Sequence, residues 1–274
     1  MRRTLVILPV LLTVALIATI APVSARAPIA IGVSSPDNGG GSHDVSEVIA
    51  AVDAHTTEVG RKPRIWSIWS KWGDRGADSN GPCVAGQGTC AFPTEAVKAL
   101  HARGIMPMIW WVYVDPKNHD SNRYGRYRKI LDGKHTAYIK QWAKAAKAVG
   151  RQTGKPIIVR MFHEATGTWF PWSVGVKDNT MKRYRDAWNY VGRKFRRVGA
   201  DPHVRWLWSN VTFEYHAFPG ERYVDYVGWN LFNFGTDRKA GWTWPRKKMD
   251  KRVAATRRLT KKPIIIAEMG THYK

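Results

Sequence analysis

Short apolar runs alternate with amphipathic segments along most of the chain. Seven runs have the length and composition of buried strands, and residues at helical spacing follow several of them. The predicted strands span residues 30–34, 64–68, 106–112, 156–162, 204–208, 224–229 and 263–267. The predicted helices span residues 94–103, 134–153, 181–198 and 247–259. This alternation predicts a parallel sheet covered by helices.

The turns after the predicted strands decide between two kinds of parallel sheet. No glycine-rich phosphate-binding turn follows any of the seven, which favours a barrel over a doubly wound sheet. We therefore predict an α/β fold of the (β/α)8 TIM-barrel type. In such barrels the chemistry lies at the carboxyl ends of the strands, so residues at strand ends are the first candidates for function.

The first 27 residues have the pattern of an export signal. Arg2 and Arg3 precede the apolar run 5–20, and small residues at 25–27 suit a signal peptidase. The alternative is an uncleaved membrane anchor, because the run is long for a signal core. No stop-transfer flank follows, so we expect cleavage, a secreted extracellular protein and a single barrel domain over residues 28–274.

The composition is strongly basic, with a formal net charge of +23. Such a balance favours contact with polyanions, and adhesion to an anionic wall polymer is one expectation. The basic residues crowd segments 181–197 and 246–262, so the alternative is that they form solvated faces of two helices. Nucleic acid is not a predicted partner, because an exported chain with no nucleic-acid-binding motif gives it no support.

Cys83 and Cys90 are the only cysteines in the sequence. In an exported protein they are predicted to form a disulfide that closes a short glycine-rich loop, the alternative being two free thiols. The sequence has no metal-ligand spacing, so neither a metal nor another cofactor is predicted.

Two predicted strands run directly into a glutamate, Glu164 after strand four and Glu268 after strand seven. Glycoside hydrolysis needs such a pair: one carboxyl group protonates the leaving oxygen, and an ionised carboxylate attacks or activates water. Burial at a barrel mouth penalises a carboxylate, so a glutamate there usually has a role. The alternative is that each glutamate simply pairs with a nearby Lys or Arg.

Three segments resemble motifs of a known family. The string from Arg160 to Trp172, Arg-Met-Phe-His-Glu-Ala-Thr-Gly-Thr-Trp-Phe-Pro-Trp, resembles the fourth-strand signature of glycoside hydrolase family 26, the β-mannanase family. Segments 223–233 and 262–270 are similar to its sixth-strand and seventh-strand motifs. Their order and spacing agree, so the resemblance covers most of the mature chain.

The resemblance implies a retaining double displacement on β-mannan or a related β-glycan, with Glu164 as acid/base and Glu268 as nucleophile. It also implies that His163 supports the surroundings of the nucleophile, that Arg160 keeps it ionised and that Trp169 stacks on a sugar. The other aromatic candidates for substrate contact are Trp110, Trp111, Trp172 and Phe232. For Arg160, His163 and the tryptophans, the alternative is packing in the barrel interior.

The chain departs from the family pattern at several positions. Phe232 stands where a tyrosine usually donates to the nucleophile, Asn230 replaces an aspartate, and Ala165-Thr166 replaces Met-Asn. The sequence ends at Lys274, so the barrel is predicted to lack its eighth strand and helix, to be truncated at its C-terminus and to be a weak or unstable enzyme. The opposing hypothesis is a degenerate, non-catalytic relative that binds polysaccharide.

Overall fold

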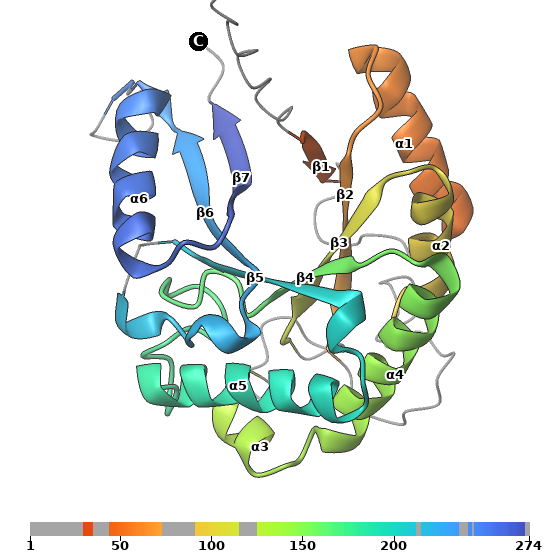
Figure 1. The fold of residues 1–274 in the computed structure, drawn as a ribbon. Helices are drawn as coiled ribbons and strands as arrows, with labels where there is room; N and C mark the ends of the chain where they lie inside the picture. Colours follow the sequence, from red (N-terminus) through yellow and green to blue (C-terminus); the bar gives the residue numbers. More distant parts are fainter. Residues whose placement is uncertain are drawn as a thin grey trace, which may run out of the picture.

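The computed structural model describes residues 30–34, 44–72, 91–114, 125–211, 215–235, 241–242 and 244–271. Within these residues seven parallel strands form one sheet in the order of the sequence. They are β1 (Gly32–Ser34), β2 (Ile65–Lys71), β3 (Met106–Val112), β4 (Ile157–Met161), β5 (Val204–Asn210), β6 (Tyr226–Asn233) and β7 (Ile264–Thr271). Figure 1 shows the sheet curled, with helices around its outer face, which confirms the predicted barrel-type fold.

The helices that cover the sheet agree with the prediction and add to it. They are α1 (Val45–Val59), α2 (Thr94–Ala102), α3 (Tyr127–Leu131), α4 (Thr136–Thr153), α5 (Met181–Arg197) and α6 (Pro245–Leu259), with short 3-10 turns η1 (Asp201–His203), η2 (Tyr215–Ala217) and η3 (Glu221–Tyr223). The four predicted helices correspond to α2, α4, α5 and α6. Both ends of each predicted helix lie within two residues of the observed ends. Helix α1 was not predicted, because it buries only Val48 and Val52 and so has a weak apolar stripe.

The last two strands are longer than predicted. Strand β6 continues to Asn233 and β7 to Thr271, four residues beyond the predicted ends in each case. The apolar runs stop earlier, because Asn230 and Glu268 interrupt them while the backbone pairing goes on. Among the described strands β1 and β7 are the two edges of the sheet, as expected.

Aromatic rings fill the layer between the sheet and α4. Trp111 stacks on Trp72 with ring centroids 4.4 Å apart, and on Trp142 of α4 at 4.2 Å. The Trp111 indole donates to the Tyr138 hydroxyl at 3.0 Å, which satisfies its one polar atom. This layer is hydrophobic core on the outer side of the barrel.

The interior side of the sheet carries a row of large residues at matching register. Trp69 of β2 pairs with Trp110 of β3, which pairs with Arg160 of β4. The Trp69 and Trp110 ring centroids lie 4.5 Å apart, and the Arg160 guanidinium carbon lies 4.0 Å from the Trp110 centroid. Arg160 therefore places a buried positive charge inside the barrel, against the face of the Trp110 ring.

Two predictions concern segments outside the described residues. The export signal at 1–27 and the pair Cys83 and Cys90 lie outside them. None of the helices in the described ranges is both long and apolar enough to cross a membrane.

Candidate active site

Glu164 sits on a sharp turn immediately after β4. The strand ends at Met161, and both Phe162 and Glu164 have positive φ angles, 46° and 53°. Residues other than glycine rarely adopt this conformation, and such strain clusters at functional sites. The Glu164 amide donates to the Ser209 carbonyl of β5 at 3.0 Å, which ties the turn to the neighbouring strand.

The Trp169 ring folds back over this turn and contacts the glutamate. Its indole nitrogen donates to Glu164 Oε2 at 2.9 Å, although 57 % of the tryptophan is exposed. Gly167 makes this possible, because a Cβ at that position would lie 2.7 Å from the Trp169 ring. Trp169 therefore combines an exposed aromatic face with a direct hydrogen bond to the carboxyl group.

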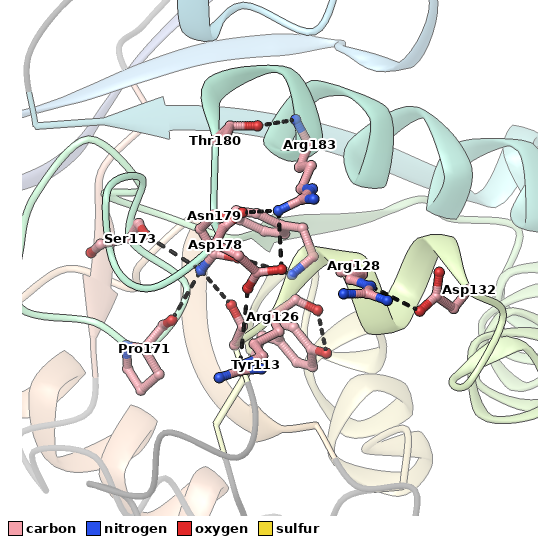
Figure 2. A network of polar contacts seen from close by, with 12 residues as sticks. Tyr113, Arg126, Arg128, Asp132, Pro171, Ser173, Asp178, Asn179, Thr180 and Arg183 are labelled. Atoms are coloured by element: carbon pink, nitrogen blue, oxygen red, sulfur yellow. Dashed lines mark hydrogen bonds and ion pairs between the residues drawn. The ribbon is translucent and has the colours of Figure 1, made fainter.

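A buried amide holds the rest of the loop between β4 and α5. Asn179 Nδ2 donates to the carbonyls of Gly125 at 2.7 Å and Pro171 at 3.1 Å, and its Oδ1 accepts from the Tyr127 amide at 3.1 Å (Figure 2). The neighbouring Asp178 accepts from Arg183 at 3.0 Å. These contacts fix the loop that carries Glu164 and Trp169 against the start of α3.

Glu268 lies within β7 and not at its end. The β6–β7 register shifts at this point, so that Trp229 pairs with Ile266 and Asn230 pairs with Glu268, with Ala267 as the extra residue. A β-bulge of this kind redirects side chains and is common beside active sites. Here it brings Glu268 to the same face as Asn230.

Arg160 joins the two sides of the site. Its Nη2 lies 2.7 Å from Glu268 Oε1, and its Nε donates to Ser209 Oγ at 2.7 Å. Arg160 and Glu268 therefore form an ion pair across the site. Arg160 is fully buried, which makes Glu268 its natural counter-charge, because an unpaired buried charge is costly.

Asn230 contacts both glutamates with a single nitrogen atom. Its Nδ2 donates to Glu164 Oε1 and, at 2.9 Å, to Glu268 Oε1. Its Oδ1 accepts from Arg160 Nη2 at 3.3 Å. The two carboxyl groups, which are more than 100 residues apart in the sequence, thus share one amide.

The surroundings of Glu164 favour its protonated form. Burial raises the pKa of Glu164, and the nearby charge of Glu268 raises it further, against opposing contacts from Trp169, Arg160 and Asn230. The second carboxylate is instead held by the Arg160 guanidinium. A carboxyl group whose pKa is raised by burial and a neighbouring charge is suited to donate a proton.

His163 is buried among aromatic rings below this turn. Burial, together with the charge of Arg160, lowers the pKa of His163 well below its usual value, so the imidazole is neutral. Its ring centroid lies 5.0 Å from that of Trp110, and its carbonyl accepts from the Trp172 indole at 2.8 Å. We therefore assign His163 and Trp172 to the support of the loop and not to contact with a sugar.

Trp111 and Trp110 lie in the packed part of the barrel and not at its mouth. The expectation that Trp111 binds a sugar is wrong, because Trp111 is completely buried on the outer side of the sheet. Trp110 is buried beneath Arg160. Phe232 is half-buried on the interior side, and its ring would lie 3.1 Å from a Cβ added at Gly270.

Sequence reasoning missed Ser209 and underrated Asn230. Ser209 lies beyond the predicted end of the fifth strand, and nothing in its local sequence indicates a contact with Arg160. Asn230 directly follows the predicted sixth strand, and its place at a strand end is the signal that could have placed it in the site.

The chain matches one family model and several known proteins. The model described as Glycosyl hydrolase family 26 matches residues 106–269, more than half of the chain. Endoglucanase H of Acetivibrio thermocellus is 34 % identical over 183 residues, which are 63 % of this chain and 19 % of that protein. Mannan endo-1,4-beta-mannosidase of Bacillus subtilis is 30 % identical over 120 residues, 39 % of this chain and 33 % of that protein. The chain therefore spans a third or less of the curated relatives that it matches.

Solved structures of family 26 proteins resemble this chain in fold. The family 26 domain of an endo-β-mannanase/endo-β-glucanase from Prevotella bryantii superimposes with a TM-score of 0.62 at 15 % identity, over 90 % of this chain and 77 % of that one. A family 26 β-mannanase from Bacteroides ovatus gives a TM-score of 0.59 at 18 % identity, over 90 % and 73 % of the two chains.

Proposed function

The chain belongs to glycosyl hydrolase family 26, and on that premise we propose that it is an endo-acting β-glycanase that hydrolyses β-1,4-mannan or a related β-glycan with retention. The relatives that support this substrate class are an endoglucanase and a mannan endo-1,4-beta-mannosidase. The proposal depends most on one observation, the amide nitrogen of Asn230 shared by Glu164 and Glu268.

That shared nitrogen supports a retaining reaction over an inverting one. Acceptors on the two N–H groups of one amide lie about 5 Å apart when both hydrogen bonds have ordinary lengths. Retaining glycosidases have their carboxyl groups about 5–5.5 Å apart, whereas inverting enzymes need about 6.5–9.5 Å to admit a water molecule. A donor shared by Glu164 and Glu268 therefore supports the short carboxyl separation that direct attack on the sugar needs.

In the proposed first step, a Glu268 oxygen attacks the anomeric carbon and the glycosidic bond breaks. Glu164 gives its proton to the departing oxygen, so the leaving sugar is released as an alcohol and a covalent glycosyl ester remains on Glu268. In the second step Glu164 takes a proton from water, whose oxygen displaces Glu268. Arg160 stabilises the carboxylate of Glu268 before attack and after release.

The opposing function is polysaccharide binding without hydrolysis. Phe232, which has no hydroxyl group to donate, lies on the interior side and favours it. The exposed Trp169 face would serve either function, because a flat apolar ring can stack on a sugar. Catalysis is the better-supported function, since binding alone does not need two carboxyl groups on one amide.

The substrate class can be tested with three soluble polymers: β-mannan, mixed-linkage β-glucan and β-xylan. We expect the protein to release reducing ends from at least one, and to lower its viscosity early because an endo-acting enzyme cuts inside the chain. A Glu268→Ala preparation made in parallel is the control for contaminating activity. A folded protein that releases nothing from all three, yet is retained by an insoluble form, would be a binding protein.

We also propose that the exported protein adheres to anionic wall polymers through α6. Its exposed outer side carries Arg246, Lys247, Lys251, Arg257 and Arg258. Asp250 is the one acidic residue of α6, and it lies 3.8 Å from Arg246, so most of this charge has no acidic partner within the helix. Export and the Cys83–Cys90 disulfide remain proposals that are supported by the sequence.

A further inference from the structure

Trp242 lies against the backbone of a glycine just beyond the end of β6. A Cβ added at Gly235 would lie 2.8 Å from the Trp242 ring, so any other side chain at this position would displace the indole. Gly235 also has a φ angle of 54°, in the left-handed region that glycine adopts readily. Although the ring is held in this way, 41 % of Trp242 is exposed.

The same arrangement of a tryptophan on a glycine occurs after β4, beside the other glutamate. Trp169 is 57 % exposed, and a Cβ added at Gly167 would lie 2.7 Å from its ring. Gly167 follows Glu164 by three residues, as Gly235 follows the end of β6 by two. An exposed ring that is already held by its neighbours loses little freedom when a ligand covers it, which favours binding.

A short row of aromatic rings leads from the surroundings of Glu268 to Trp242. Phe232 of β6 pairs with Gly270, which follows Glu268 by two residues in β7. The Phe232 ring centroid lies 5.6 Å from that of Phe234, which is 43 % exposed. Phe234 directly precedes the glycine that carries Trp242. The exposed rings are therefore continuous with the catalytic site and not a separate apolar patch.

This end of β6 belongs to the mouth of the barrel. Strands β6 and β7 are parallel and end together (Figure 1), and the carboxyl ends of barrel strands carry the chemistry. Lys248 of α6 donates to the Phe232 carbonyl at 3.1 Å, so the start of α6 is fixed against the same end. From Asn230 to Asn233 the strand covers about 10 Å, which places the residues after β6 at the rim of the mouth.

We propose that Trp242, together with Phe234, forms a sugar-binding subsite at this rim, on the Glu268 side of the site. The inference rests on the proposed function and extends it. The ligand is a neutral β-1,4-linked pyranose chain, because the C–H groups on the face of such a sugar stack on an indole ring. A chain that contacts both Trp169 and Trp242 spans the catalytic pair, as an endo-acting enzyme requires.

Trp242→Ala tests the subsite in a protein that does not cleave its ligand. Calorimetric titration of the Glu268→Gln protein with β-1,4-linked mannohexaose and cellohexaose measures Kd without turnover. We expect Trp242→Ala to raise Kd about tenfold for the hexasaccharide that binds, which corresponds to the loss of one stacked ring. The control is Tyr215→Ala, which removes an equally exposed ring, 43 %, that lies against Arg258 of α6. We expect this control to leave Kd unchanged.

A second pair of variants moves the Trp242 ring without removing it. Asparagine tolerates the left-handed conformation, so Gly235→Asn costs the backbone little, but its Cβ displaces the indole. Gly154 at the end of α4 has a φ angle of 65° and nothing within 4 Å of an added Cβ. We expect Gly235→Asn to weaken binding as Trp242→Ala does, and Gly154→Asn to keep the original Kd.

Turnover of two substrates separates binding at the rim from damage to the catalytic pair. With Glu268 intact, Trp242→Ala should lower kcat/KM for the polysaccharide about tenfold. It should leave an aryl monoglycoside, which occupies only the position of cleavage, unaffected. An equal loss on both substrates, or an unchanged hexasaccharide Kd, would overturn the subsite. A change of oligomeric state in size-exclusion chromatography with unchanged Kd would do the same, because it assigns Trp242 to contact between copies.

The two measurements also separate this inference from the proposed function. Hexasaccharide binding that depends on Trp242, in a wild-type protein that hydrolyses no glycan, would overturn the function and leave the subsite. Hydrolysis that is the same with and without Trp242 would overturn the subsite and leave the function. A folded protein that neither binds nor hydrolyses any of these glycans would overturn both.

Discussion

Glu268→Ala should lower kcat on the preferred glycan by about four orders of magnitude or more, as removal of a catalytic nucleophile does in other enzymes. The loss should fall on kcat because the bond to the anomeric carbon forms only in the reaction. The variant also leaves Arg160 buried beside an empty space, so we expect a lower melting temperature as well. Initial rates and thermal unfolding measured on the same preparation separate the two effects.

Glu268→Gln is the control for the lost volume, because it fills the same space without a nucleophilic oxygen. Its rate should be as low as that of Glu268→Ala. Azide should restore turnover of an aryl glycoside only in the alanine variant, where the space admits the anion, and the glycosyl azide formed should have inverted configuration. Substantial activity in both variants would show that Glu268 has been given the wrong role.

Glu164→Gln should lower kcat on a polysaccharide by about 10²–10⁴-fold, the usual range for loss of a general acid. A substrate with a good leaving group, such as a dinitrophenyl glycoside, needs no proton in the first step. We therefore expect glycosylation of this substrate to be nearly as fast as in wild type, seen as a burst of phenolate, while the second step is slowed.

The pH profile of the same pair of proteins gives an independent test of Glu164. The group must be protonated to act as an acid, so wild-type kcat/KM should fall as the pH rises through the pKa of Glu164. Burial and the Glu268 charge raise that pKa, which extends activity toward neutral pH. In Glu164→Gln this basic limb should disappear. A variant that keeps the limb would assign it to another group.

The sequence predicted the pair of glutamates better than it predicted their setting. Glu164 and Glu268 follow apolar runs, and strand ends of a barrel are where function is expected. The structure adds what a linear pattern does not contain: the positive φ of Glu164 and the bulge at Ala267. Both depend on contacts between strands, such as the hydrogen bond from the Glu164 amide to Ser209.

The direction of the tryptophan side chains was predicted less well than the position of the two glutamates. Trp110 and Trp111 are adjacent in β3, so one must face the interior and the other the helices. Alternation alone shows that at most one of them can face the site, and the packing of α4 decides that Trp111 is the outer one. Trp172 lies in a loop, where no periodicity indicates direction, and its burial depends on contacts with Phe170 and His163.

The fold itself was largely readable because its strands are apolar on both faces. Strand β3 was predicted with its observed bounds, and α5 to within one residue, since both have long uninterrupted patterns. Helix α1 was missed because its apolar pattern is short and weak. Its N-terminus is well defined by Asp44, which accepts from the amides of Ser46 and Glu47, but its apolar stripe is thin.

The configuration of the first product is the most direct test of a double displacement by Glu268 and Glu164. Proton NMR during hydrolysis of a short β-linked oligosaccharide records the anomeric signal of the new reducing end before mutarotation. Retention requires the β anomer to appear first and the α anomer to follow as equilibrium is reached. If the α anomer appears first, water attacks the sugar directly, and a nucleophilic role for Glu268 is contradicted.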